Sequence, residues 1–203
     1  GQTIQVLQVN QSINSFYTYE HILEDGIPKF SPLSPTNMYV DQNEDGLINE
    51  NDLVVNQSPV PNWILGITGN GSYKNIDLSF TFRAMLGNYI YNNIASNNGT
   101  FQSFEGIRPS NIHTSALITQ FTSRQLMSDY YLEDGSFLRL DNISLGYNFN
   151  MLKWAKLRAF VTGQNLFFIT NYSGLDPEIQ PNGIDNNLYP RPKTFIGGIS
   201  ITF

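Results

Sequence analysis

Hydrophobic and polar residues alternate with a period of two along several stretches in the second half of the chain. In Ile76–Leu86 every second residue is apolar, and the positions between them are mostly polar and include Asp77 and Arg83. Such alternation is typical of a β-strand whose two faces meet different environments. Trp63–Tyr73 has the same pattern and is joined to it by the short turn Lys74-Asn75. The two stretches therefore predict an antiparallel hairpin.

Three later stretches continue the pattern and predict three more strands. They are Ser136–Phe149, Lys156–Ile169 and Lys193–Phe203. The first of them breaks the alternation, because Leu138 and Leu140 fall on the opposite face from Ile143. Either a bulge lies near Asp141-Asn142 or the upper half of this strand stands clear of the apolar environment. Each strand has roughly the length of about ten residues that a tilted strand needs to cross a bilayer.

The connections between the predicted strands alternate in length. Lys74-Asn75 and Asn150–Ala155 are short, whereas residues 87–135 and 170–192 form long polar connections. Outer-membrane barrels keep short turns on the periplasmic side and long loops outside the cell. We therefore expect 87–135 and 170–192 to be extracellular loops and the last residue, Phe203, to lie in the periplasm.

The fold class predicted from this pattern is all-β, a transmembrane antiparallel β-barrel. About five strands cannot close a barrel, and an open edge in lipid would leave backbone groups unpaired. These strands are therefore expected to be the carboxy-terminal part of a larger barrel. A transmembrane helix is not expected, because no apolar run reaches about 18 residues. The start of the sequence has no leader pattern, so a signal peptide and an amino-terminal portion are expected outside it.

Composition agrees with an envelope protein and excludes some partners. Charged residues make up 14% of the 203 residues, well below the roughly one quarter usual in soluble domains. The formal net charge is -6 and no basic cluster is present, which argues against nucleic-acid binding. The chain has no cysteine, so neither disulfides nor thiolate metal sites are possible.

The first third of the chain lacks the long alternating stretches of the remainder. Residues 1–62 are rich in loops, with short β-like runs at Ile4–Val9 and Phe16–Ile22. We assign 1–62 to an extracellular loop region and 63–203 to the carboxy-terminal barrel strands with their long loops. One short helix is predicted within the first long loop, near Ala116–Arg124.

A calcium-binding pattern lies within residues 1–62. Oxygen-bearing side chains at loop positions one, three and five, glycine at six and a carboxylate at twelve follow the spacing of an EF-hand loop. The candidate ligands are Asp41, Asn43, Asp45 and Asp52, with Leu47 through its backbone carbonyl. Asp52 is one methylene shorter than the usual glutamate, and no amphipathic helix precedes the loop. A solvated turn therefore stays open as the alternative to bound Ca²⁺.

Four sequence strings resemble those of one protein family. Asp134 to Tyr147 reads DGSFLRLDNISLGY, Gly163 to Phe167 reads GQNLF, Tyr172 to Glu178 reads YSGLDPE and Tyr189 to Phe195 reads YPRPKTF. They are similar, in order and spacing, to strings of the SusC/RagA-type TonB-linked outer-membrane transporters of Bacteroidota. The resemblance spans most of the chain and is strongest after Tyr131.

The resemblance implies a plugged barrel of about 22 strands, of which this chain supplies the last five or so. It also implies a SusD-like surface lipoprotein as partner, energy supplied by TonB through the plug, and import of an oligosaccharide or a peptide. The plug and its TonB contact have no matching positions in this chain. The remainder of the barrel would be the chain's structural partner.

No feature of the sequence predicts an enzyme. His21 and His113 lie far apart in loops, and no nucleophile motif of the Gly-x-Ser-x-Gly kind is present. Asp77 and Arg83 would face a barrel lumen, where an ion-pair network is a more common role than substrate contact. Aromatic residues at strand ends fit an interface girdle: Trp63, Tyr73, Tyr147, Phe149 and Phe203.

Two other functions stay open at this point. One is a soluble, calcium-bearing β-sandwich that acts in adhesion or carbohydrate binding, with the apolar faces as its core. The other is a barrel of the same fold recruited to protein secretion or motility instead of nutrient uptake.

Overall fold

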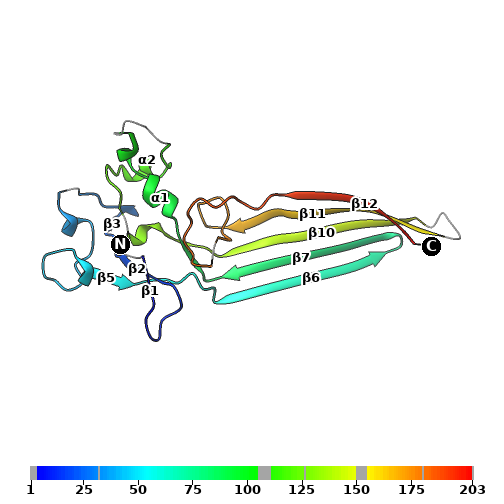
Figure 1. Cartoon of the computed structure of the whole chain (residues 1–203), viewed down its shortest axis with the longest axis horizontal. Helices are drawn as coiled ribbons and strands as arrows, with labels where there is room; N and C mark the ends of the chain where they lie inside the picture. The colour runs from blue at the N-terminus through cyan, green and yellow to red at the C-terminus, as the bar shows by residue number, and fades with distance from the viewer. Residues whose placement is uncertain are drawn as a thin grey trace.

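The computed structural model describes residues 4–31, 33–104, 111–125, 127–149, 155–179 and 181–202. An extended sheet carries a compact region at one end, which we call the head (Figure 1). The head contains the described residues of 4–62, 87–135 and 171–188. Phe203, which was predicted to lie in the periplasm, is outside the described residues, and so is most of the predicted short connection Asn150–Ala155.

The extended sheet has five antiparallel strands. They are β6 (Trp63–Tyr73), β7 (Ile76–Leu86), β10 (Phe137–Phe149), β11 (Lys156–Thr170) and β12 (Thr194–Thr202), in the order β12-β11-β10-β7-β6. The five predicted strands are thus confirmed, and the first two have the predicted bounds. Within the described ranges β6 and β12 each pair on one side only, so the sheet is open and forms no closed barrel.

A bulge explains the broken alternation in β10. The register shifts between Leu140 and Asn142 in the pairing with both neighbouring strands. Asp141 is the extra residue, so Leu138 and Leu140 lie on the same face as Ile143. The bulge that the sequence offered as one of two explanations is therefore confirmed.

The two faces of the sheet differ sharply. Most of the apolar face is uncovered in the described ranges. The following large side chains on it are at least 39% exposed: Trp63, Leu65, Ile67, Tyr73, Ile76, Leu78, Leu86, Leu138, Leu145, Tyr147, Val161, Phe167, Ile169, Phe195, Ile199 and Ile201. The opposite, polar face carries the charged side chains of the strands. A contiguous apolar surface of this extent marks an interaction with protein or membrane.

The head consists of short elements. Its strands are β1 (Gln5–Val6), β2 (Ser15–Tyr19), β3 (Leu23–Glu24), β4 (Ile27–Pro28), β5 (Leu53–Val55), β8 (Tyr89–Tyr91) and β9 (Leu132–Asp134). Its helices are α1 (Asn93–Asn98) and α2 (Ala116–Thr119), with 3₁₀ turns η1 (Pro35–Asn37), η2 (Glu50–Asp52), η3 (Phe101–Phe104) and η4 (Asp129–Tyr131). In the part of the chain that the structure describes, no helix combines the length and hydrophobicity needed to span a membrane.

The head has its own small aromatic core. Phe16, Tyr91, Ala95, Phe121 and Tyr131 are buried against one another. Residues 1–62 and the loop 87–135 therefore pack into one body, because each supplies part of this core.

The predicted helix Ala116–Arg124 is wrong at its carboxyl end. α2 stops at Thr119, because Gln120 adopts a left-handed conformation with φ 52° and its backbone N–H caps the carbonyl of Ala116.

Candidate functional site: the sheet-top pocket and the arginine–carboxylate cluster

A cavity of about 530 Å³, which we call the sheet-top pocket, lies on the polar face of the sheet at the head end. Its floor is made by Ile64, Met85 and Phe137. These three residues lie opposite one another on neighbouring strands, so they share one face of the sheet. The polar face thus turns apolar at its upper end.

Three segments form the walls of the sheet-top pocket. The residues that precede β6, those that follow β7 and the last long loop close around it: Pro59, Val60, Pro61, Asn88, Tyr89, Ile90, Pro177, Glu178, Ile179, Pro181, Gly183 and Arg191. Gly183 has φ 73°, and a Cβ at this position would collide with Pro59. A glycine is therefore needed where two of these walls approach each other.

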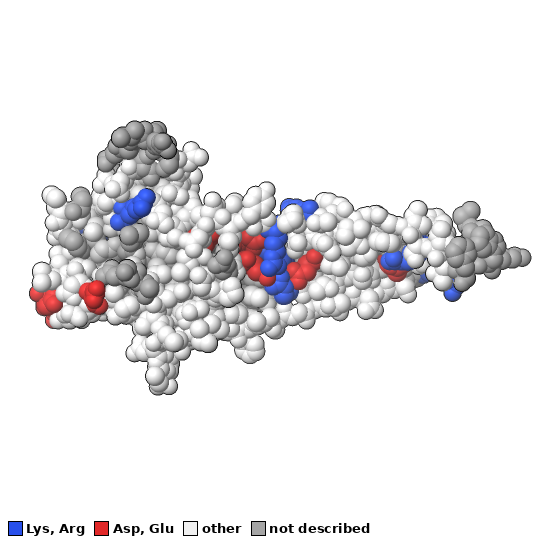
Figure 2. All heavy atoms as spheres, in the orientation of Figure 1, with Lys and Arg blue, Asp and Glu red and all other residues white. Residues whose placement is uncertain are grey.

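Three arginines and three carboxylates lie next to the sheet-top pocket. We call this group the arginine–carboxylate cluster: Arg83, Arg139, Asp141, Asp176, Glu178 and Arg191. Figure 2 shows blue and red side chains gathered where the sheet meets the head. The cluster joins residues from β7, β10 and the last long loop.

Glu178 is the centre of the arginine–carboxylate cluster. Its carboxylate accepts hydrogen bonds from Arg83 at 2.8 and 2.9 Å and forms an ion pair with Arg191 at 2.8 Å. Arg139 approaches it at 3.5 Å, and Arg83 also binds Asp141 at 3.0 Å. Bidentate arginine–carboxylate contacts are strong and fix geometry. They hold the segment around Glu178 against the polar face.

Arg139 provides the buried anchor of the cluster. It is 1% exposed, and its guanidinium lies 5.5 Å from the Phe137 ring centroid and 4.9 Å from that of Phe168. It donates a hydrogen bond to the carboxylate of Asp176. A buried charge is stable only when it is paired in this way. The last long loop is therefore tied to the sheet at Asp176.

Polar pairs continue along the same face toward the far end of the sheet. Arg158 binds Asp77 at 2.5 Å, and Asp77 also accepts a hydrogen bond from Asn148 at 3.0 Å. Asp77 and Arg83 were both predicted to lie on the polar face. Asp77 is ion-paired with Arg158, and Arg83 is ion-paired with Asp141 and Glu178. This agrees with the interpretation of a structural network.

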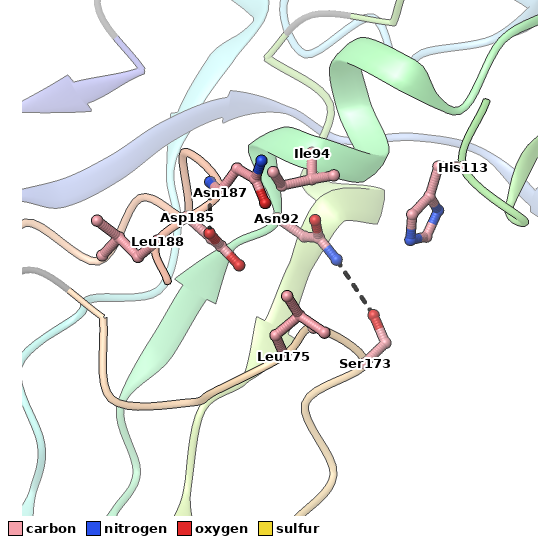
Figure 3. Close-up of a pocket in the computed structure, with 9 residues that line it drawn as sticks. Asn92, Ile94, His113, Ser173, Leu175, Asp185, Asn187 and Leu188 are labelled. Atoms are coloured by element: carbon pink, nitrogen blue, oxygen red, sulfur yellow. Dashed lines mark hydrogen bonds between the residues drawn. The ribbon is translucent and has the colours of Figure 1, made fainter. Parts of the chain in front are cut away.

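A smaller pocket of about 170 Å³ lies in the head, between α1 and the last long loop (Figure 3). Asn92 donates to Ser173 Oγ at 3.1 Å and to Glu133 at 2.8 Å across it. Tyr172 donates to Asp185 at 2.6 Å, and burial together with this contact raises the pKa of the Tyr172 hydroxyl. The polar groups around this pocket are therefore largely engaged with one another.

The two histidines have separate, local partners. His113 lines the smaller pocket, and its Nδ1 lies 2.9 Å from Ser115 Oγ. His21 is buried, with Nε2 donating to the carbonyl of Lys29 and Nδ1 accepting from the hydroxyl of Ser128. Burial lowers the pKa of His21, so its ring is neutral near pH 7.

The predicted calcium loop is closed by hydrogen bonds to its own backbone. Asp41 accepts from the N–H groups of Asp45 and Gly46, and Asp45 accepts from Leu47 N–H at 2.8 Å. Hydrogen bonds from Asn43 and Leu47 lower the pKa of Asp45. Asp41, Asn43 and Asp45 are thus brought together in one turn.

The twelfth position of that loop behaves differently. Asp52 is fully buried and accepts from the N–H groups of Gln42 and Asn49, forming a capping box with Asn49. Across the described residues, no group of three or more His, Asp or Glu side chains is arranged to hold a metal ion. Binding of Ca²⁺ at Asp41, Asn43, Asp45, Leu47 and Asp52 stays a prediction.

Sequence reasoning missed most of the arginine–carboxylate cluster. Parity placed Arg83 on the polar face, but nothing in the pattern paired it with Glu178 or paired Arg139 with Asp176. One signal was available. Charged residues are only 14% of the chain, and the last long loop carries the string Asp176-Pro177-Glu178. Arg83 and Arg139, on neighbouring strands of the sheet to which this loop returns, lie directly opposite each other.

Comparisons with known proteins give a consistent result, although no family profile matches the sequence. The chain is 37% identical to the TonB-dependent receptor SusC of Bacteroides thetaiotaomicron over 98% of its own length and 20% of the receptor. It is 34% identical to the TonB-dependent receptor P26 of Formosa agariphila, over 81% of the chain and 19% of that receptor. The chain therefore spans about a fifth of these curated relatives.

Solved structures agree in fold. A structure of the RagAB peptide transporter superposes with a TM-score of 0.69 at 23% identity, covering 91% of this chain and 22% of that one. The RagAB peptide importer in its closed-closed state gives the same TM-score at 22% identity, covering 97% of this chain and 24% of that one. The sequence relatives and the shared fold together show that the chain belongs to the SusC/RagA-type TonB-dependent receptors, of which it is a segment.

Proposed function

We propose that the chain forms part of the wall of a TonB-dependent transporter in the bacterial outer membrane. Its strands would be the carboxy-terminal ones of a plugged barrel of about 22 strands. The observation that carries this proposal is the uncovered apolar face of the five-stranded sheet, opposite a face lined with ion pairs. Lipid on one side and a polar lumen on the other is the environment that such a sheet requires.

The proposal includes an orientation. All long connections lie at the head end of the sheet, and the turn between β6 and β7 lies at the other end (Figure 1). Since barrels of this kind have short periplasmic turns, the head would be extracellular and the end of β12 periplasmic. The arginine–carboxylate cluster would then line the lumen near its outer mouth.

The partners proposed are those of the whole receptor. A SusD-like surface lipoprotein would cover the head, and TonB would act through a plug outside this chain. The substrate would be an oligosaccharide or a peptide. The relatives are named as receptors and as a peptide transporter, which supports import and argues against an enzyme.

The two other functions make different demands. A soluble β-sandwich needs a second sheet on the apolar face, and in the described ranges most of the large side chains of that face stay exposed. A barrel recruited to secretion or motility would have the same wall but no SusD-like partner. Co-purification of that lipoprotein separates uptake from this alternative.

We also propose that the loop with Asp41, Asn43 and Asp45 binds Ca²⁺ at the surface of the head. The gathering of these three side chains in one turn supports it. Asp52 and the carbonyl of Leu47 would complete the ligand set only if Asp52 gave up part of its capping role.

The test of the main proposal uses the full-length receptor. It should require detergent to stay monodisperse, show heat-modifiable migration as folded barrels do, and take up labelled substrate into cells only when TonB is present. A receptor that is monodisperse in plain buffer would contradict the membrane assignment. Uptake that is unchanged without TonB would contradict energised import.

A further inference from the structure

The last long loop is fixed at two points. Asp176 accepts a hydrogen bond from the buried Arg139 of β10. Farther along the loop, the carbonyl of Gly183 accepts one from the backbone N–H of Tyr91 in the head at 2.9 Å. The segment 177–179 directly follows the first fixed point and lines the sheet-top pocket. Glu178 supplies the ionic contacts of this segment to the sheet.

The two carboxylates differ in what their withdrawal would leave behind. If Asp176 withdrew, the guanidinium of Arg139 would stay buried with its nearest remaining carboxylate 3.5 Å away. If Glu178 withdrew, Arg83 would keep Asp141, which it contacts at 3.0 and 3.2 Å. A buried charge that loses its partner is costly. Withdrawal of Glu178 therefore leaves both strand arginines paired, whereas withdrawal of Asp176 does not.

Glu178 itself would also keep a partner. It lies 2.8 Å from Arg191, which belongs to the same loop and can move with it. The arginine–carboxylate cluster therefore separates into three complete pairs, one within the sheet, one within the loop and one that joins the two. Only the contacts of Glu178 with Arg83 and Arg139 are lost in this rearrangement.

One of the lost contacts is incomplete. The Nε–H group of Arg139 is buried and has no hydrogen-bond partner within the described ranges, although Glu178 lies 3.5 Å away. Withdrawal of Glu178 thus breaks no hydrogen bond to Arg139. The attachment of Glu178 to the sheet consists mainly of its two hydrogen bonds from Arg83.

We propose that Glu178 is a clasp that opens while Asp176 stays fixed, so that the segment 177–179 moves off the polar face as a flap. Opening would uncover the floor of the sheet-top pocket. The inference goes beyond the proposed function, because the contacts of the clasp lie within this chain. Only the position of the flap, at the outer mouth of a lumen, rests on that function.

The experiment uses the full-length receptor in detergent, first checked for heat-modifiable migration, with any other cysteine replaced by serine. Met85→Cys places a thiol in the pocket floor, and a neutral maleimide measures how fast this thiol is modified. Glu178→Gln removes the charge that Arg83 holds. It should raise the rate about tenfold, the effect of losing a hydrogen bond between charged groups.

Asp141→Asn is the matched control. It removes a carboxylate from the same Arg83 but leaves Glu178 as the counter-ion, so the clasp should stay closed and the rate should not rise. Salt provides a second test that needs no change in the clasp. Raising NaCl from about 0.05 M to about 1 M screens the ion pairs and should speed modification when Glu178 is present, but not in Glu178→Gln.

The outcomes decide the proposal. Equal rates with and without Glu178→Gln overturn the clasp, and so does an equal rise in Asp141→Asn. Should Glu178→Gln fail to fold, the receptor with Glu178 decides alone, because a rate that is the same at both salt concentrations also overturns the clasp. A receptor without heat-modifiable migration contradicts the proposed function instead and leaves the clasp to be judged by the thiol rates.

Discussion

Arg139 and Asp176, 37 residues apart in the sequence, form an ion pair in which both side chains are nearly inaccessible to solvent. The arginine comes from β10 and the aspartate from the last long loop. The rings of Phe137 and Phe168 lie next to the guanidinium and help to bury it. This pair joins the loop to the sheet.

Removing one partner of this pair should be costly. Asp176→Asn removes the nearer counter-ion of the buried Arg139 and leaves only Glu178, 3.5 Å away, which we expect to cost about 3–5 kcal/mol of unfolding free energy. The measurement is denaturant unfolding of the full receptor in lipid vesicles. The double variant Arg139→Met with Asp176→Leu should recover part of the loss, because it buries no charge.

A surface pair provides the control. Glu24 and Lys29 are 2.8 Å apart but largely exposed, so Glu24→Gln should change the unfolding free energy by about 1 kcal/mol or less. If Asp176→Asn has no larger effect than Glu24→Gln, the buried pair does not hold the loop.

Charges on the apolar face should block membrane assembly. Phe80→Arg or Ile199→Arg places a cation toward lipid, at a cost of about 2–4 kcal/mol near the bilayer midplane. Thr81→Arg points to the polar face and should be mild. The folded, heat-modifiable fraction of the receptor measures the effect. Equal losses at the three positions would contradict the assignment of the faces.

Acid should loosen the head through His21. Burial lowers the pKa of His21, so the unfolded head binds a proton more readily than the folded one. The stabilisation is complete above the ordinary histidine pKa of about 6.5 and is lost as pH falls through the lower folded value. Hydrogen exchange in β2 and α1 should therefore accelerate below about pH 6.5.

The neighbours of His21 set the limits of this effect. Tyr39 and Tyr130 face its ring, and Asp129 accepts a hydrogen bond from its backbone N–H. Burial raises the pKa of Asp129, so that carboxylate contributes stability at low pH and loses it as pH rises, opposite to His21. His21→Gln should remove the acceleration on acidification, while His113→Gln should keep it. Persistence in His21→Gln would assign the effect to another group.

The calcium proposal predicts protection of one loop. If Ca²⁺ binds, protease cleavage within residues 38–56 should slow in its presence and speed up with chelator. Asp41→Ala and Asp45→Ala should make cleavage insensitive to the ion, whereas Asp25→Ala, in another turn of the head, should not. Cleavage that is the same with Ca²⁺ and with chelator would reject the site.

The parts of the fold that follow from local pattern were predictable. β6 and β7 have the predicted bounds because their alternation is unbroken and Lys74, with φ 53°, supplies the turn. The bulge at Asp141 was one of the two explanations that the failed alternation offered. These features depend on residues close together in sequence.

The parts that depend on distant contacts were not predictable. The pairing of Glu178 with Arg83 brings together residues 95 apart, and no local pattern encodes it. The core of the head joins Phe16, which begins a predicted β-like run, to Phe121, which lies in the segment predicted as a helix, and neither pattern indicated that the two segments pack together. Short strands without repeated alternation give too little signal to reveal such packing.

The arginine–carboxylate cluster has equal numbers of positive and negative groups. A lumen bordered by this part of the wall would attract neither cations nor anions strongly, because the charges of the cluster cancel. Solutes passing it would be sorted by shape and hydrophobicity, and neither cations nor anions would be enriched there.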